Sequence, residues 1–315
     1  MKIFVSGAAG FIGSAVSAEL VKRGHKVLGM AIDDNEVNIV RKTGAIPVQG
    51  DLFKGGEWCN IIAEADKVIS LTQPTKMGDV ITRDNVESYS RKHTEAVTNL
   101  IKAASDGNAR QVIVTNHTEC FGNRDGKWVE SDAAAHDPVG FCRPLAGSFE
   151  AIERTAEDAG LSLVNLYPAP VYGDGGWFPM VVDEMIKGKM KMVSPGTNYM
   201  NLIHIDDVAA LYSLVVEKVE GSDVFILSDD RPVKQIDMIS HLADLLDVDV
   251  PEMVSVAEFE KLYGWLTAEC LSCNTRVSSL KAIQTLGHKP IIRSYEQGFA
   301  YTLKLMGVEP RRKAA

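Results

Sequence analysis

The sequence predicts an α/β fold in which helices cover both faces of a doubly wound parallel sheet. Up to about residue 166, short apolar stretches typical of buried strands alternate with longer stretches of helical periodicity. Parallel strands need such crossover connections, which are right-handed in nearly all sheets. At 315 residues the chain is long enough for one large or two modest domains.

The first predicted strand, residues 2–6, runs directly into a glycine-rich turn. Gly7, Gly10 and Gly13 follow it at three-residue spacing, and the apolar periodicity of a helix comes next. Glycine permits a tight turn and a close approach to a diphosphate, and the N–H groups of a helix N-terminus attract that anion. In a β-turn-α unit this pattern indicates a dinucleotide cofactor.

The other elements are predicted from the same periodicities. Strands are expected at 26–31, 45–52, 67–72, 111–115 and 161–166, and long helices at 86–104 and 145–159. Beyond residue 168 we expect a glycine-rich loop at 172–176, a helix at 178–187, a helix capped by Asp206 or Asp207, a strand at 224–227 and a mainly helical remainder up to residue 307.

Charge and cysteine content exclude several function classes. The net charge of −9 argues against nucleic acid or an anionic membrane as the main partner, because phosphate binding needs clustered Lys and Arg. No apolar run is long enough to span a bilayer. Five cysteines form no disulfide framework, and Cys270 and Cys273 lack a second pair or a nearby histidine for zinc. We expect packing thiols, no metal and a reducing cytoplasm.

The end of the second strand bears on the type of cofactor. An acidic residue there would bind the adenosine ribose, whereas a basic one would accept a 2′-phosphate. The chain has apolar residues at 31 and 32, and Asp33 and Asp34 after them would repel a 2′-phosphate. Arg41 and Lys42 keep NADP open, so the prediction is NAD or NADP, with NAD slightly favoured.

With these strands placed, the chain resembles the extended short-chain dehydrogenase/reductase superfamily, in its NAD-dependent epimerase/dehydratase branch. The resemblance covers nearly the whole length. It rests on the glycine motif at 7–13, Gly-Asp-Leu at 50–52, Val-Tyr-Gly-Asp-Gly at 171–175, Ile-His-Ile-Asp-Asp-Val-Ala at 203–209, and Asn-x-Arg at 274–276 with Leu-Gly-x-x-Pro at 286–290.

The resemblance implies a Rossmann domain at 1–166 and 202–228 and a smaller, discontinuous, mainly helical substrate domain at 167–201 and 229–307, followed by a tail at 308–315. It also implies a homodimer formed through the helices near 86–105 and 145–159. The residues expected at the dinucleotide are Gly7, Gly10, Phe11, Ile12, Gly13, Ala31, Ile32, Asp51, Leu52, Leu71, Thr72, Gln73, Thr115, Tyr167 and Pro168.

One part of the family pattern is missing. The family carries Ser or Thr after the fifth strand, and a Tyr-x-x-x-Lys whose tyrosine transfers a proton while the lysine lowers its pKa and holds the ribose. Aligned on the Phe-Gly at 121–122, the hydroxyl position falls on His117, and the Tyr and Lys positions hold Leu145 and Phe149. A family asparagine corresponds to His93. Leucine and phenylalanine donate no proton, so the usual relay cannot operate.

His117 is the best candidate to replace the relay, because imidazole, with a reference pKa of about 6.5, gives or takes a proton at neutral pH. Its alternative role is a hydrogen bond to a loop carbonyl. Thr118 is the second catalytic candidate, as a group that orients a substrate oxygen. Substrate contacts are expected from Arg143, Leu145, Phe149, Tyr172, Trp177 and Phe178, although Tyr172 is also a core candidate and Arg143 a surface ion-pair candidate.

Together these observations predict an atypical NAD(P)-dependent oxidoreductase, a reductase or dehydrogenase, that acts on a small, largely apolar or aromatic metabolite. Two alternatives stay open. One is a redox-neutral isomerase, dehydratase or cyclase on the same fold, and the other is a non-catalytic regulator that senses the dinucleotide.

Overall fold

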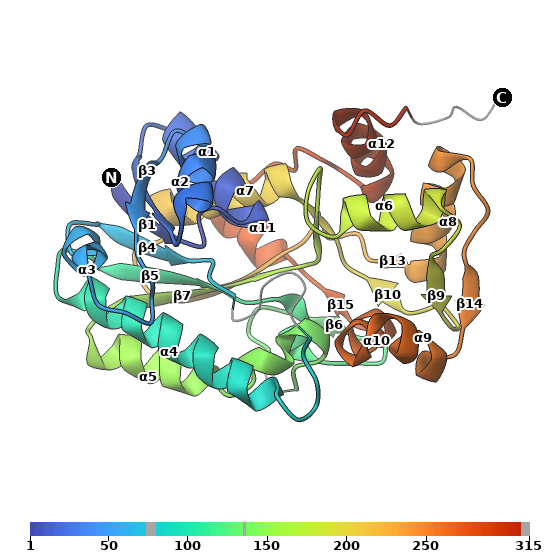
Figure 1. The fold of residues 1–315 in the computed structure, drawn as a ribbon, viewed down its shortest axis with the longest axis horizontal. Helices are drawn as coiled ribbons and strands as arrows, with labels where there is room; N and C mark the ends of the chain where they lie inside the picture. The colour runs from blue at the N-terminus through green and yellow to red at the C-terminus, as the bar shows by residue number, and fades with distance from the viewer. Residues whose placement is uncertain (74–79, 135–136, 310–315) are drawn as a thin grey trace.

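A parallel sheet of seven strands lies at the centre of the computed structural model, which describes residues 1–73, 80–134 and 137–309 (Figure 1). The strands are β1 (Lys2–Ser6), β2 (Lys26–Ala31), β3 (Ile46–Gln49), β4 (Lys67–Ser70), β5 (Gln111–Thr115), β7 (Ser162–Pro168) and β12 (Asp223–Leu227). Their spatial order is β12-β7-β5-β4-β1-β2-β3, and every neighbouring pair is parallel. The order reverses at β1, which confirms the doubly wound α/β prediction.

Helices cover both faces of this sheet, as Figure 1 shows. One face carries α1 (Phe11–Lys22), α2 (Asp34–Lys42), α7 (Ile205–Lys218) and α11 (Leu280–Leu286), and the other carries α3 (Glu57–Ile62), α4 (Val86–Ser105) and α5 (Phe149–Asp158). Successive strand residues point to opposite faces, so Ile3 and Val5 join one hydrophobic core and Phe4 the other. This two-sided burial explains the continuous apolar runs of the strands.

The rest of the chain builds a second group of elements around its own hydrophobic core. Its helices are α6 (Phe178–Ile186), α8 (Gln235–Leu246), α9 (Val256–Tyr263), α10 (Trp265–Ser272) and α12 (Tyr295–Leu305). Four two-stranded sheets pair β8 (Val171–Tyr172) with β11 (Ile203–His204), β10 (Tyr199–Met200) with β13 (Val233–Lys234), β9 (Lys191–Val193) with β14 (Glu252–Val254), and β6 (Trp128–Val129) with β15 (Arg276–Val277).

Two short 3-10 helices connect the sheet to this second group: η1 (Thr118–Phe121) and η2 (Gly140–Leu145). The helix predicted from residue 145 therefore starts four residues later, at Phe149, because the preceding turn is wound as η2 and contains Pro144. Similarly, the strand predicted over 45–52 is shorter and ends at Gln49.

The predicted N-cap of α7 is wrong. The cap is His204, whose ring Nδ1 accepts a hydrogen bond from the backbone N–H of Asp206 at 3.2 Å. Asp207 is buried and binds a distant loop instead, so its carboxylate is not available to the helix end.

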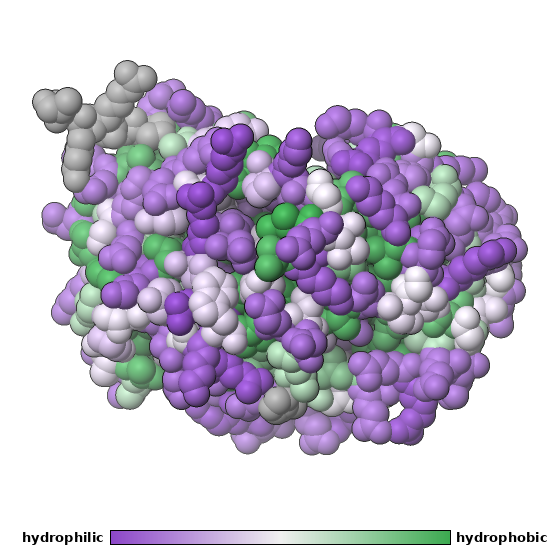
Figure 2. All heavy atoms as spheres, turned by 180° about the vertical axis from the view of Figure 1, so that it is seen from behind, coloured by the Kyte–Doolittle hydropathy of each residue, from purple (hydrophilic) through white to green (hydrophobic). Residues whose placement is uncertain are grey.

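The surface is mainly hydrophilic on the side shown in Figure 2. On the face in Figure 2, hydrophilic residues predominate and apolar ones are scattered among them. Within the described ranges, no helix has both the length and the apolar character that a membrane span requires.

Candidate functional site

The predicted dinucleotide residues gather where the central strands end, at the point where the sheet order reverses. Gly7 follows β1 with a φ of +70°, a conformation that favours glycine. A Cβ on Gly7 would lie only 2.7 Å from the carbonyl oxygen of Leu71, which follows β4. A Cβ on Gly13 would overlap the carbonyl oxygen of Gly7. The close packing of this turn therefore excludes larger residues at both positions.

The start of α1 is open to an anion. Gly10 is its exposed N-cap, no side chain caps the first turn, and no acidic residue lies within it. At this positive end of the helix, no carboxylate of the first turn therefore competes for the backbone N–H groups that begin with Phe11 and Ile12. The Phe11 ring is half-buried and lies against the glycines at 175–176, where an added Cβ would meet it at 3.0 Å or less. These residues fit the diphosphate of a dinucleotide.

At the end of β2, Ala31 is buried and Ile32 is half exposed. Asp33 caps α2 by accepting a hydrogen bond from the Glu36 N–H at 2.9 Å, and the Glu36 carboxylate accepts one from the Ile32 N–H at 2.9 Å. Asp33 is thus the N-cap of α2. Arg41 lies in the last turn of α2, away from this end. The carboxylates of Asp33 and Glu36 therefore both lie at the end of β2.

Beyond β3, Asp51 accepts a hydrogen bond from the Phe53 N–H at 3.0 Å and pairs with Lys54 at 3.2 Å. Leu52 is buried, and its carbonyl accepts a bond from the Asn99 side chain of α4 at 2.9 Å. These contacts fix the turn that the sequence predicts beside the adenine.

The other predicted dinucleotide residues divide into two groups. Thr72 is half-buried, like Gln73, and donates a hydrogen bond from its hydroxyl to Ser6 at 2.9 Å. Thr115 is buried with its hydroxyl 2.8 Å from that of Tyr212 in α7. Tyr167 and Pro168 are buried as well. The ring of Tyr167 packs at a tilt against Phe121, with the ring centroids 4.8 Å apart. The side chains of these three residues therefore belong to the core.

His117 lies at the same edge, two residues beyond β5. Asn116 anchors this turn, because its N–H donates to the carbonyl of Leu166 at 2.7 Å and its side-chain amide donates to Asn165 Oδ1 at 3.1 Å. The ring of His117 is half-buried and makes no hydrogen bond within the described residues. Burial lowers its pKa, and the nearby Glu119 carboxylate opposes that shift. The predicted alternative, a hydrogen bond to a loop carbonyl, is absent among these residues.

The predicted substrate contacts need correction. Leu145 and Phe178 have no exposed surface, and Tyr172 has 1%. All three pack in hydrophobic cores, Leu145 with a half-buried Phe149 beside it. We therefore withdraw Leu145, Tyr172 and Phe178 as substrate contacts. The sequence could not distinguish these roles, because an apolar residue after a strand has the same pattern in a core and in a binding site.

Arg143 forms the predicted surface ion pair. Its Nε and Nη2 donate to the two carboxylate oxygens of Glu269 at 2.8 and 3.0 Å, and Glu269 also accepts the N–H of Gly140. This bidentate pair joins η2 to α10. Trp177 is half-buried, and its indole nitrogen has no partner in the described structure.

A small cavity lies beside the turn that follows His117. It has a volume of about 30 Å³ and is lined by Thr118, Glu119, Tyr199, Asn201 and Cys270 among others. The thiol of Cys270 lies 3.5 Å from the Glu119 carboxylate. Thr118, the second catalytic candidate, is thus a buried wall residue of this cavity.

A second histidine, His93, is buried in α4. His93 is 1% exposed in α4, and its Nδ1 lies 3.0 Å from the hydroxyl of Ser148. Burial, followed by repulsion from His117, lowers the pKa of His93 to about 4. The sequence indicated that His93 replaces a family asparagine, but it gave no signal for Ser148.

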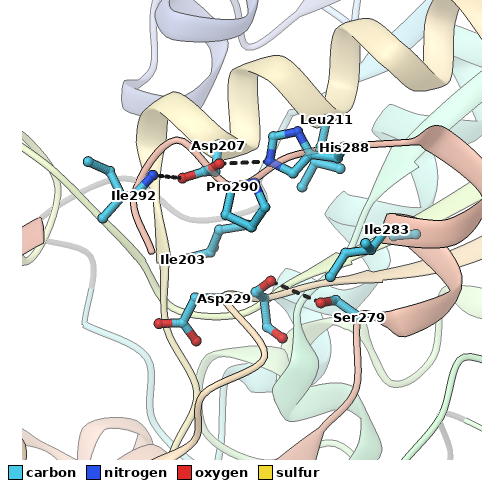
Figure 3. Close-up of a pocket in the computed structure, with 11 residues that line it drawn as sticks. Ile203, Asp207, Leu211, Asp229, Ser279, Ile283, His288, Pro290 and Ile292 are labelled. Carbon is cyan, nitrogen blue, oxygen red and sulfur yellow. Dashed lines mark hydrogen bonds and ion pairs between the residues drawn. The ribbon is translucent and has the colours of Figure 1, made fainter. Parts of the chain in front are cut away.

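A separate buried cluster lies beneath α7, around a cavity of about 10 Å³ (Figure 3). Asp207 accepts hydrogen bonds from the N–H groups of Ile291 and Ile292 and lies 2.7 Å from His288 Nε2. Asp229 also lines this cavity. The motif at 203–209 therefore joins α7 to the loop before α12. His204 in the same motif is buried, with its Nε2 3.3 Å from the hydroxyl of Thr302 in α12.

The cysteines and the sheet edge give no metal site. All five cysteines are free thiols, and no group of three or more His, Cys, Asp or Glu in the described ranges has the geometry to hold a metal ion.

Comparisons with known proteins agree with this geometry. A family model described as "NAD dependent epimerase/dehydratase family" matches residues 3–227. An uncharacterized protein of Saccharomyces cerevisiae is 28% identical, over 92% of this chain and 95% of its own length. A 2-alkyl-3-oxoalkanoate reductase of Stenotrophomonas maltophilia is 26% identical, over 84% of this chain and 80% of its own.

Among solved structures, a UDP-glucuronic acid 4-epimerase from Bacillus cereus in complex with NAD superposes with a TM-score of 0.78. It is 17% identical, and the match covers 98% of this chain and 99% of that one. This likeness establishes the fold.

Proposed function

Because the chain belongs to the NAD dependent epimerase/dehydratase family, we propose that it is an NAD(P)-dependent oxidoreductase that transfers hydride without the usual tyrosine and lysine. It acts as a reductase or dehydrogenase on a small metabolite. The reductase of Stenotrophomonas maltophilia, named for a ketone-bearing substrate, supports this direction of the proposal.

The observation that carries the proposal is the glycine turn between β1 and α1. Gly7 has a positive φ, Gly13 leaves no room for a Cβ, and the first turn of α1 has no side-chain cap. Such a turn at the reversal point of a parallel sheet suits the diphosphate of a nicotinamide dinucleotide. When bound, the dinucleotide supplies or accepts the hydride.

Proton transfer needs a different group from the one in the family pattern. No tyrosine anywhere in the sequence is followed four residues later by lysine. Leu145 is fully buried and Phe149 packs against the same core, so neither leaves a vacant polar position.

We assign the proton to His117. In reduction, a ring nitrogen of His117 gives a proton to the substrate atom that gains one, and in oxidation it takes that proton back. The half-buried ring, free of other hydrogen bonds in the described structure, supports this role. Thr118 lines the adjacent cavity and orients a substrate oxygen.

NAD is the preferred cofactor in this proposal. The Asp33 and Glu36 carboxylates lie at the end of β2, where a 2′-phosphate would add negative charge to negative charge. Arg41 is seven residues along α2 from its first residue, about 10 Å away at 1.5 Å per residue, and so cannot neutralise that phosphate.

The substrate is a small molecule with both an apolar part and a polar group. Pro170, Met200 and Val277 give the cavity beside Thr118 an apolar wall, and Asn201 gives it a hydrogen-bonding group. Glu119 in the same lining disfavours an anionic substrate at this point.

The variant His117→Ala tests the assignment. We expect turnover, measured as NAD(P)H consumption with a panel of ketones and enones, to fall by roughly 10²- to 10⁴-fold. Dinucleotide affinity should change by less than about twofold, because a group that acts only on the proton contributes little to ground-state binding. His25→Ala is the control, since His25 lies before β2 at the opposite edge of the sheet.

The outcomes separate the competing functions. Unchanged turnover in His117→Ala would contradict the assignment of the proton to His117. Product formation without net consumption of cofactor would favour a redox-neutral isomerase, dehydratase or cyclase. Tight binding with no reaction would favour a dinucleotide-sensing regulator, a role that the burial of Leu145 also suits.

A further inference from the structure

The cavity beside Thr118 contains a carboxylate that the protein itself does not neutralise. Glu119 is half-buried in the lining and is the one acidic residue there. In the described part of the chain its side chain forms no ion pair and accepts a hydrogen bond from the Cys270 thiol alone, at 3.5 Å. Burial lowers the pKa of the neighbouring His117 more than Glu119 raises it, so this imidazole is mainly neutral at pH 7 in the free protein.

The basic side chains of the surrounding elements have other partners. Arg124 and Arg276 donate from Nε to backbone carbonyl groups, at 2.7 and 2.6 Å. Arg143 of η2 forms the bidentate pair with Glu269. The Glu119 carboxylate is therefore available to a ligand.

The thiols of the lining add no second negative charge. Burial raises the pKa of Cys273 to about 11. Burial, followed by the Glu119 carboxylate, raises the pKa of the Cys270 thiol well above its usual range. A protonated thiol is only a weak hydrogen-bond donor, so Cys270 leaves most of the accepting capacity of the carboxylate unused.

The size and walls of the cavity suit a primary ammonium group. Its volume of about 30 Å³ has room for one group of the size of a water molecule. Tyr199 contributes an aromatic ring that already attracts a cation, because the Arg276 guanidinium lies 4.8 Å from its centroid. Pro170, Met200 and Val277 form an apolar wall that suits the carbon chain attached to the ammonium.

We propose that this cavity binds a primary ammonium group of the substrate and that Glu119 is the residue that selects for it. The inference rests on the proposed function and narrows its substrate class to amino ketones, or to amino alcohols in the oxidative direction. Glu119 lies two residues after His117, so their Cα atoms are at most about 7 Å apart. A small molecule spans this distance with a few bonds.

The ammonium group takes no part in the reaction. In reduction, the carbonyl carbon gains a hydride from NADH and its oxygen gains a proton from His117, to which solvent then returns one. One hydride and one proton are consumed, and the amine leaves as the amino alcohol. Glu119 thus acts on substrate choice and not on the transferred proton.

Ligand-observed NMR with butylammonium, butanol and tetramethylammonium measures binding without turnover. We expect butylammonium to bind in the millimolar range and butanol at least tenfold more weakly, because only the ammonium donates charge-assisted hydrogen bonds to Glu119. Tetramethylammonium has no N–H and is too large for the cavity, so it should bind no better than butanol. This probe separates the site from general attraction of cations to an acidic protein.

The variant Glu119→Gln removes the charge and keeps the size of the side chain. The backbone carbonyl of Glu119, which accepts the N–H groups of Gly122 and Val139, is unchanged, so the variant should fold. We expect its affinity for butylammonium to fall roughly tenfold or more, to the level of butanol. Glu130→Gln, the same change at an exposed position, is the control and should bind like the wild type.

A turnover assay tests the same choice with matched ketones. In 2-pentanone a methyl group replaces the ammonium of 4-amino-2-butanone. The wild type should favour the amino ketone at least tenfold in kcat/KM, and Glu119→Gln should lose this preference.

Equal binding of butylammonium to the wild type and Glu119→Gln would overturn the proposal, and so would tetramethylammonium binding as well as butylammonium. Binding that depends on Glu119, without turnover of either ketone, would support the ammonium site and contradict the proposed function. Equal turnover of the two ketones by the wild type would overturn the substrate class and leave the proposed function intact.

Discussion

Leu145 lies at the position where the family pattern predicts a tyrosine. It has no exposed surface and packs in a core with Cys120, Phe121 and Tyr167. The position at which the family pattern predicts a phenol is therefore part of the packing.

Leu145→Tyr should not rebuild the relay. The larger, polar ring would overpack a closed core, and we expect the free energy of unfolding to fall by roughly 1–3 kcal/mol in denaturant titration. The neighbouring Ala146→Tyr is the control, because Ala146 is exposed and a substitution there should stay within about 0.5 kcal/mol. Equal stability of Leu145→Tyr and the wild type would mean that the site has room for a phenol.

At the scale of elements, the start of α2 carries the charges on which the proposed preference for NAD over NADP rests. The Asp33 carboxylate caps α2 by accepting the N–H of Glu36, and the Glu36 carboxylate accepts the N–H of Ile32. Both carboxylates therefore lie at the end of β2. In the proposed function, the residues that cap this helix therefore also repel a phosphate on the adenosine ribose.

We predict that the double variant Asp33→Asn, Glu36→Gln shifts selectivity toward NADP. The neutral side chains keep hydrogen-bond acceptors for the cap but remove the repulsion of a 2′-phosphate, so the ratio of NADP to NAD affinity should rise about tenfold or more. Titration calorimetry with both dinucleotides measures this ratio, and Asp158→Asn, in the last turn of α5, is the control. A ratio that stays constant would show that these carboxylates do not face the ribose.

The cluster beneath α7 has a measurable pH dependence. Burial raises the pKa of Asp229 to about 7, against the opposing hydrogen bond from the Arg231 N–H, and its Oδ2 has no partner among the described residues (Figure 3). The folded protein thus binds this proton more tightly than the unfolded chain, whose aspartates titrate near 3.9. The resulting stabilisation is complete below about pH 4 and is lost as the pH rises through about 7.

Asp229→Asn should therefore flatten the pH profile of stability. Between pH 5 and pH 8, the wild type should lose roughly 2 kcal/mol of unfolding free energy that the variant keeps, at about 1.4 kcal/mol per pKa unit. Denaturant unfolding at the two pH values measures the difference, with the exposed Asp249→Asn as control. A variant that follows the wild-type profile would contradict the assigned titration of Asp229.

The sequence predicts the strands and most helices well, because their periodicities are local. α4, for example, covers Val86–Ser105, where the pattern predicts 86–104. Contacts between distant segments leave no such signal. Asp207 resembles a helix cap in sequence, yet its partners lie more than eighty positions away. For the same reason the bond between His93 and Ser148, 55 positions apart, could not be anticipated.

At the scale of the whole molecule, the predicted dinucleotide residues lie at one end of the central sheet. The chain crosses repeatedly from this sheet to the second group of elements and back. β12 returns to the sheet after β8 to β11, and α11 then packs beside it. The division into two discontinuous domains stays a prediction, as does the homodimer through the two long helices. The outward faces of α4 and α5 expose no large apolar residue, so such a dimer would be held by polar contacts.

The most direct test of the central claim is calorimetric titration of the protein with NAD and NADH. We predict one binding site per chain with micromolar affinity, at least tenfold weaker binding in Gly13→Ala, where a Cβ would overlap Gly7, and unchanged binding in Gly221→Ala, where a Cβ meets nothing within 4 Å. A wild-type protein with no measurable affinity for any nicotinamide dinucleotide, oxidised or reduced, would contradict the account.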